Sequence, residues 1–195
     1  MTMTNRTIAM LIFLAVGEGR VIAAPATPAP PSPANPGAVQ GDVLSTLADG
    51  EKKILALEDA VPQNKFGWRP APGVRSVAEA YLHIAFANYN MVRIATGKTP
   101  PAEAGWALDR AKWDAQTSDK AKIKSVLEAS FAFAHGAIGS LSDTDLERKV
   151  DFFGHPMTAR AVLLMLVGHD NEHLGQSIAY ARANKIVPPW SQGQK

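Results

Sequence analysis

Two histidines, His169 and His173, lie four residues apart in the segment GHDNEHLGQSIAYARANKIVPPW, which spans residues 168–190. Residues four apart on a helix lie one above the other, with Cβ atoms roughly 5 to 6 Å apart, so the two imidazoles can share one cation. The apolar run AVLLMLV at residues 161–167 precedes them and predicts that their side of the helix faces inward. Two imidazoles alone form a weak metal site, so a third ligand must come from elsewhere in the chain.

His83 is the candidate for that third ligand. It lies between Leu82 and Ile84 in a second helical segment, on a face that is mostly apolar. Three histidines from two facing helices would supply three nitrogen ligands and leave a position open to water or substrate, as in a catalytic metal site. We therefore predict a metal site made of His83, His169 and His173. The alternative without a metal keeps the three rings apart, each bonded to an acceptor of its own.

Other polar residues have weaker claims to a chemical role. Glu172, three residues after His169, is a weak candidate for a catalytic residue that orients an imidazole or takes a proton, but its side chain can equally point into solvent. His135 could provide a fourth ligand, and we interpret it instead as a core or rim histidine. His155 lies in a turn and is expected to be solvated.

Long amphipathic segments must position these residues. The sequence predicts four helices, over about residues 39–60, 76–97, 118–141 and 158–185. Ser76 and Glu79 form a capping-box pattern, in which each side chain satisfies a free backbone donor at the start of the second helix. A short extended piece is expected at KVDFFG, residues 149–154, and Trp106 and Trp113 are expected to pack over an end of the domain. Four such helices without a convincing series of strands predict an all-α helical bundle.

The N-terminal residues differ in composition from the rest of the chain. The apolar run TIAMLIFLAV is followed by small residues, with Ala24 and Ala26 placed as a cleavage signal. This pattern predicts a secretory signal peptide over residues 1–26, which is too short to be a membrane span. Residues 27–37 are predicted to be a Pro-rich linker. The bundle domain then occupies residues 38–195, and the protein is expected to be exported to the periplasm or the extracellular space.

Composition excludes several classes of partner and chemistry. The formal net charge is only +2 and no cluster of Lys and Arg is present, so nucleic acid is not an expected partner. The chain contains no cysteine, which excludes disulfides and a lipid-modified cysteine. After removal of the signal peptide we therefore expect a protein with no stable membrane span, held together by packing or by a ligand.

Two segments of the chain resemble the DinB superfamily, also described as DinB/YfiT-like metalloenzymes. They are WRPAPGVRSVAEAYLHIAFAN at residues 68–88 and GHDNEHLGQSIAYARANKIVPPWS at residues 168–191. The first leads through Trp, Pro and Gly into a histidine-bearing helix, and the second is H-x3-H followed by GQ and PPW. The resemblance extends from about Val39 to the end of the chain.

This resemblance implies an up-down-down-up four-helix bundle of the DinB/YfiT-like type. It also implies a divalent metal cation, zinc or nickel, held by three histidines that correspond to His83, His169 and His173. Members of the family are often dimers, which makes a homodimer an expectation here. Characterised relatives include S-transferases and isomerases that use bacillithiol or mycothiol. The predicted export argues against such a thiol cosubstrate, because low-molecular-weight thiols are mainly cytosolic.

The leading functional hypothesis is a metal-dependent enzyme of the transferase or hydrolase type acting on a small molecule. Such a cation would lower the pKa of a water or of a substrate thiol. A metallopeptidase is a weaker hypothesis: HDNEH formally fits H-x-x-E-H, but no His, Asp or Glu follows His173 to supply a third ligand. A different class is a non-catalytic bundle that binds a metal or a small ligand. A fourth protein ligand would favour that class, and an open position facing a cleft would favour chemistry.

Overall fold

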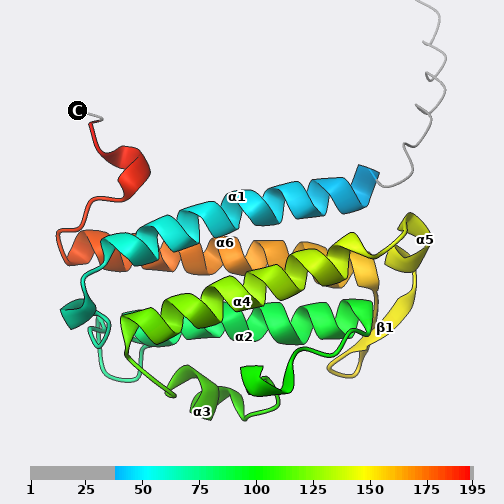
Figure 1. The fold of residues 1–195 in the computed structure, drawn as a ribbon, viewed down its shortest axis with the longest axis horizontal. Coiled ribbons are helices and arrows are strands. Elements are labelled where there is room, and N and C mark those ends of the chain that lie inside the picture. Colours follow the sequence, from blue (N-terminus) through cyan, green and yellow to red (C-terminus); the bar gives the residue numbers. More distant parts are fainter. Residues whose placement is uncertain (1–37, 194–195) are drawn as a thin grey trace, which may run out of the picture. The chain divides into compact units, whose positions relative to one another are not determined.

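The structure of the protein is a computed structural model, which describes residues 38–193. The predicted signal peptide, residues 1–26, and the predicted linker, residues 27–37, lie outside the described residues. The described part is mostly helical (Figure 1). Its helices are α1 (Ala38–Ala60), α2 (Val77–Thr96), α3 (Arg110–Asp114), α4 (Lys120–Gly139), α5 (Asp143–Leu146) and α6 (Ala159–Ala183). Its strands are β1 (Lys149–Phe152) and β2 (His155–Thr158).

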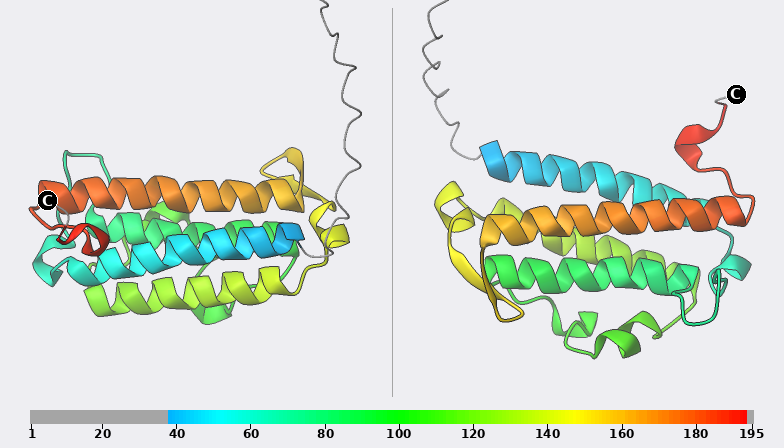
Figure 2. Two further views of the ribbon diagram at one scale, coloured as in Figure 1. Left: turned by 90° about the horizontal axis from the view of Figure 1, so that it is seen from above. Right: turned by 180° about the vertical axis from the view of Figure 1, so that it is seen from behind.

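The four long helices, α1, α2, α4 and α6, pack side by side as a bundle (Figures 1 and 2). Both α1 and α2 pack against α4 and against α6. The apolar stripe of each helix therefore faces one shared core. Its largest fully buried side chains include Leu47, Ile54, Leu57, Tyr81, Leu82, Ile84, Ile123, Leu127 and Phe131.

Side-chain caps determine where the long helices begin. Ser76 accepts the backbone N–H of Glu79, whose carboxylate accepts the N–H of Ser76, so the predicted capping box of α2 is confirmed. Asp119 caps α4, which begins two residues later than predicted, and Thr158 caps α6 where predicted. These caps fix the first residues of α2 and α6, the two helices that carry the histidines.

The segment between α2 and α4 contains a short helix, α3, that the sequence pattern did not predict. Trp113 on this helix is fully buried, and its indole N–H donates to the backbone carbonyl of Leu82 at 2.6 Å. α3 lies along the side of α2 (Figure 1). Trp113 attaches it there through the bond to Leu82 and does not cover an end of the bundle. Trp106 is half-buried, with the Arg93 guanidinium 5.0 Å from its ring centroid.

The expected extended piece at residues 149–154 is part of a β-hairpin. β1 pairs antiparallel with β2, with Val150 opposite Met157. The two residues between the strands, Phe153 and Gly154, both have positive φ, at 53° and 86°. None of the helices in the described part of the chain is long and apolar enough to span a membrane.

Candidate metal centre

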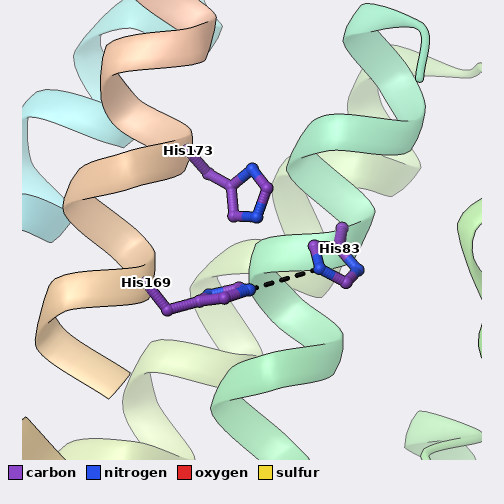
Figure 3. A group of neighbouring side chains, drawn as sticks. All are labelled: His83, His169 and His173. Carbon is purple, nitrogen blue, oxygen red and sulfur yellow. Dashed lines mark hydrogen bonds between the residues drawn. The ribbon is translucent and has the colours of Figure 1, made fainter. Parts of the chain in front are cut away.

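The three histidines selected from the sequence come from two neighbouring helices. His83 projects from α2, while His169 and His173 project from successive turns of α6 toward it (Figure 3). His83 and His173 are buried, and His169 is half-buried. One potential ligand atom from each ring lies within 4.8 Å of the others. The packing of α2 against α6 thus brings together rings that are 86 residues apart in the sequence.

Distances between the rings are short. The Nε2 atoms of His83 and His169 are 3.2 Å apart, drawn as the dashed line in Figure 3. The ring centroid of His173 lies 4.8 Å from that of His83 and 4.4 Å from that of His169. Such a group fits one small cation between the rings, because imidazole nitrogens bind zinc at roughly 2.0 to 2.1 Å.

The Nδ1 atom of each of the three imidazoles has a side-chain oxygen near it. The Nδ1 atom of His173 is hydrogen-bonded to the side-chain oxygen of Gln176 at 2.7 Å. The Nδ1 atom of His83 lies 3.4 Å from an oxygen of Asp114, and that of His169 lies 3.6 Å from an oxygen of Asp170. In metal sites the ligating histidine commonly donates its other ring N–H to such an acceptor, which orients the ring and fixes the tautomer.

The tautomer of His173 follows from a chain of hydrogen bonds that ends at a backbone carbonyl. The hydroxyl of Tyr180 donates to the carbonyl oxygen of Arg75 at 3.1 Å, and it accepts the side-chain amide N–H of Gln176 at 2.8 Å. The amide oxygen of Gln176 therefore faces His173, and Nδ1 must be the protonated nitrogen. The Nε2 lone pair of His173 is left free to bind a cation.

Arg75 connects this chain of hydrogen bonds to a second ligand candidate. Its Nε–H donates to Asp114 at 2.9 Å, and the other oxygen of Asp114 faces His83. Arg75 thus makes two contacts: its backbone carbonyl accepts a hydrogen bond from Tyr180, and its side chain donates one to Asp114. The hydrogen bonds of this set reach His173 directly, and at its other end Asp114 lies 3.4 Å from Nδ1 of His83 without a hydrogen bond to it.

Burial and neighbouring charges determine the protonation states near the histidines. Burial lowers the pKa of His173 to about 4, so this ring is neutral at pH 7, as a metal ligand must be. Burial opposes ionisation of Asp114, but the interactions with His83 and Arg75 outweigh it and hold the pKa of that carboxyl below its usual value. Burial raises the pKa of Asp170 to about 6.

The donor set fits a divalent cation. If all three Nδ1 atoms are protonated toward their oxygens, three Nε2 lone pairs point into one small space, and those of His83 and His169 are only 3.2 Å apart. Lone pairs that face each other at this distance repel, and a cation between them removes the repulsion. A direct N–H···N bond between the two rings would instead leave one Nδ1 without its proton. The arrangement therefore matches a three-histidine metal site.

Other residues considered from the sequence lie outside this group. His135 on α4 pairs with Glu51 at 2.7 Å and is half-buried, which agrees with its interpretation as a rim histidine. His155 is exposed as expected, although it begins β2 instead of lying in a turn. Glu172 is exposed on α6, and a catalytic role for it stays a prediction.

A cavity of about 310 Å³ opens beside the histidines. His83 and His169 form part of its wall, with residues from α2, α6, the start of α3 and the β-hairpin around them. It is at the small end of the range of ligand pockets, roughly 300 to 1,000 Å³. The candidate metal centre is therefore next to a space that can accept a small molecule.

Sequence reasoning missed the residues that hold the rings. Asp114 and Arg75 lie in segments without helical periodicity, so nothing in their spacing relates them to His83. The one local signal is that Asp114 follows a tryptophan, since a large aromatic residue in a polar segment suggests that the segment is anchored.

Comparisons with known proteins agree with this description of the fold. The sequence profile of the DinB superfamily matches residues 46–177. No curated protein sequence matches the chain. A DinB-like protein from Bacillus cereus ATCC 10987 has a similar structure, with a TM-score of 0.62 and 21% identity over 76% of this chain and 95% of that one.

Two further solved structures share the fold. A DinB-like protein from Bacillus subtilis has a TM-score of 0.58 and 18% identity, covering 79% of this chain and 99% of that chain. A mycothiol-dependent maleylpyruvate isomerase has a TM-score of 0.57 and 18% identity, covering 70% of this chain and 59% of that chain. At these identities the likeness shows the fold alone.

Proposed function

The chain belongs to the DinB superfamily, and on this basis we propose that it is a metal-dependent enzyme with one divalent cation held by His83, His169 and His173. We propose zinc or nickel as the cation, since three imidazole ligands suit both ions. The reaction is of the transferase or hydrolase type and acts on a small molecule. When bound, the cation lowers the pKa of a water or thiol and so supplies a nucleophile at neutral pH.

One observation carries this proposal. The hydrogen bonds from Arg75 through Tyr180 and Gln176 require a proton on Nδ1 of His173, which leaves its Nε2 lone pair beside those of the other two rings. The chain fixes which nitrogen of His173 is free, and a ligand atom of each of the three rings lies within 4.8 Å of the others. The orientation is the one that a metal ligand needs before the ion arrives.

The surroundings of the histidines favour chemistry over a purely structural metal. In the part of the chain that the structure describes, neither His135 nor Glu172 joins the three rings as a fourth ligand. Two of the rings also line the cavity of about 310 Å³. Catalytic zinc sites typically have three protein ligands and one position open toward such a space, whereas structural sites are closed by four.

We also propose an up-down-down-up order for the four long helices and export of the protein. The colour gradients along α1, α2, α4 and α6 in Figure 1 support the helix order.

The composition of residues 1–26 supports export. Recovery of the protein from the periplasm or medium with its N-terminal residues removed would agree, whereas retention of the whole chain in the cytosol would contradict export. Light scattering of the purified protein tests the expected homodimer.

Elemental analysis tests the metal site. We expect the purified protein to contain about one divalent ion per chain and the His83→Ala, His169→Ala double variant to lose it. The matched control is the His135→Ala, His155→Ala double variant, which removes two histidines that lie outside the group and should keep the metal. Equal metal content in the protein and in the first variant would contradict the proposal.

A further inference from the structure

The cavity beside the three histidines has a wall that is largely apolar. Its side chains come from α2, α6 and the hairpin, and the main apolar ones are Phe86, Met91, Phe152, Phe153 and Met165. Such a wall favours an apolar body over a sugar or a peptide backbone, which would lose hydrogen bonds to water there. At about 310 Å³ the cavity has room for a body of about one or two aromatic rings, since cavities of about half this size bind benzene.

One charged residue interrupts this apolar wall. Arg110, the first residue of α3, lines the cavity. Among the described residues, no carboxylate forms an ion pair with it. The carboxylates of the adjoining surface hollow, Glu79 and Asp114, already pair with Arg69 and Arg75. Arg110 is therefore available to an anionic group of a bound molecule, and a guanidinium is well shaped to bind a carboxylate through two hydrogen bonds.

The hairpin provides a second, independent indication of a ligand. Phe153 is 74% exposed and has a positive φ of 53°, and the following Gly154 has a φ of 86°. A two-residue hairpin turn with positive φ at both positions favours Asn-Gly, because a bulky side chain is strained at the first position. The chain nevertheless has a phenylalanine there, against Phe152 at a centroid distance of 4.8 Å and at the wall of the cavity. Neither turn geometry nor core packing requires this ring.

We propose that the cavity binds a small amphipathic organic anion as the substrate of the site. Its aromatic or aliphatic body packs against Phe86, Phe153 and Met165, and its anionic group pairs with Arg110. This inference rests on the proposed function, because the cavity places such a molecule beside the metal held by His83 and His169. Met165 is 43% exposed at this wall, so part of the apolar surface that the body would cover faces solvent.

Calorimetric titration of the purified full-length protein tests the proposal with a matched pair of probes. The probes are 4-phenylbutyrate and its neutral analogue 4-phenylbutan-1-ol, which share the apolar body and differ in charge. We expect the anion to bind more tightly than the alcohol. Arg110→Gln should weaken binding of the anion about tenfold and leave binding of the alcohol unchanged. Arg182→Gln, at an exposed arginine in the last turn of α6, is the control and should change neither.

Phe153→Asn tests the role of the hairpin without endangering the fold. Asparagine suits the turn better than phenylalanine, so the thermal midpoint of unfolding should stay the same or rise. Binding of both probes should nevertheless weaken severalfold, because each loses the same apolar contact. A destabilised variant, or one that binds both probes as tightly as the original protein, would contradict the role given to Phe153.

Three further outcomes would overturn the proposal as a whole. The first is that neither probe binds at millimolar concentration. The second is that the Arg110→Gln variant binds the anion as tightly as the original protein does. The third is that Phe153→Asn converts a dimer to a monomer without changing the binding of either probe. The last would show that a second copy of the chain covers the patch. Metal content measured on the same samples separates the two proposals: metal without probe binding contradicts only this inference, and probe binding without metal contradicts only the proposed function.

Discussion

Asp114 contacts both a proposed metal ligand and an arginine. One carboxylate oxygen lies 3.4 Å from Nδ1 of His83, and the other accepts a hydrogen bond from Arg75 at 2.9 Å. A charged acceptor at Nδ1 fixes the ring orientation and makes Nε2 a better donor to a cation. Asp114 is therefore a positioning residue that acts through His83.

Substitution of Asp114 tests this role. We expect Asp114→Ala to weaken zinc binding by about 10- to 100-fold, because His83 loses the group that holds its tautomer. Competition with a chromogenic chelator measures the dissociation constant, and Asp114→Asn, which keeps an acceptor oxygen, should recover part of the affinity. Asp49→Ala, at an exposed aspartate on α1, is the control. An unchanged affinity in Asp114→Ala would rule out the positioning role.

Glu58 is another buried acid, on α1 and separate from the histidines. Its side chain is fully buried, and within the described residues neither of its oxygens accepts a hydrogen bond. Burial raises the pKa of Glu58 from 4.5 to about 7, against the opposing effect of Lys120. As the pH rises the unfolded chain therefore releases this proton before the folded protein does, and stability decreases between about pH 4.5 and pH 7.

The variant Glu58→Gln removes this titration. The difference in free energy of unfolding between the variant and the original protein should be about 3 kcal/mol more favourable to the variant at pH 8 than at pH 4. The reason is that each pKa unit corresponds to about 1.4 kcal/mol. Denaturant unfolding at both pH values measures the difference, and Glu103→Gln, at an exposed glutamate, should show almost none. If the variant and the original protein differed in stability by the same amount at pH 4 and at pH 8, the pKa of Glu58 would not be raised by folding.

At the level of elements, α3 depends on one side chain for its position. It is only five residues long, too short to be stable by itself, and the buried Trp113 attaches it to α2. The indole ring donates to the carbonyl of Leu82 and packs near Phe86 and Tyr89, at centroid distances of 5.9 and 6.1 Å. Because Asp114 is the next residue, the anchoring of α3 also places the carboxylate that faces His83.

Trp113→Phe should therefore have two effects. Loss of the buried N–H donor and part of the ring volume should lower the free energy of unfolding by about 1 to 3 kcal/mol. The looser α3 should also weaken zinc binding severalfold. Trp106→Phe is the matched control, because Trp106 is half-buried and is not adjacent to a residue of the centre. A stability loss in Trp113→Phe with unchanged zinc affinity would show that α3 does not position Asp114.

For the whole molecule, a cation at the three histidines would join α2 and α6, two helices that are far apart in the sequence. His83 on α2 and His169 on α6 are 86 residues apart, and the unfolded chain has no preformed site of this geometry. A ligand that binds the folded state in preference to the unfolded state stabilises the fold by mass action. We therefore expect the proposed metal to stabilise the fold as well as to supply chemistry.

Thermal unfolding with and without zinc tests this linkage. At free zinc about 100-fold above the dissociation constant, the folded state should gain about 2.7 kcal/mol, which raises the midpoint by roughly 5 to 10 °C. A chelator should reverse the increase. The His83→Ala, His169→Ala variant should show no increase, and His155→Ala should behave like the original protein. An equal shift in all three proteins would place zinc binding elsewhere on the surface.

Much of the fold follows from local signals in the sequence. The apolar spacing and the Ser76–Glu79 capping box located the long helices to within about two residues, because helix starts and amphipathic faces depend on neighbours within a few positions. The juxtaposition of His169 and His173 is of the same kind, since a four-residue step on a helix determines it. The short helices α3 and α5 have no such periodicity and were missed.

Only the tertiary structure decided what surrounds the histidine pair. The approach of His83 depends on how α2 packs against α6, and the approach of Asp114 depends on the path of an irregular segment anchored by Trp113. The burial of Glu58 and the position of Phe153 at the cavity are likewise results of packing. Helical spacing determines which residues share a face, but contacts between faces arise from long-range packing, for which a single sequence contains no periodic signal.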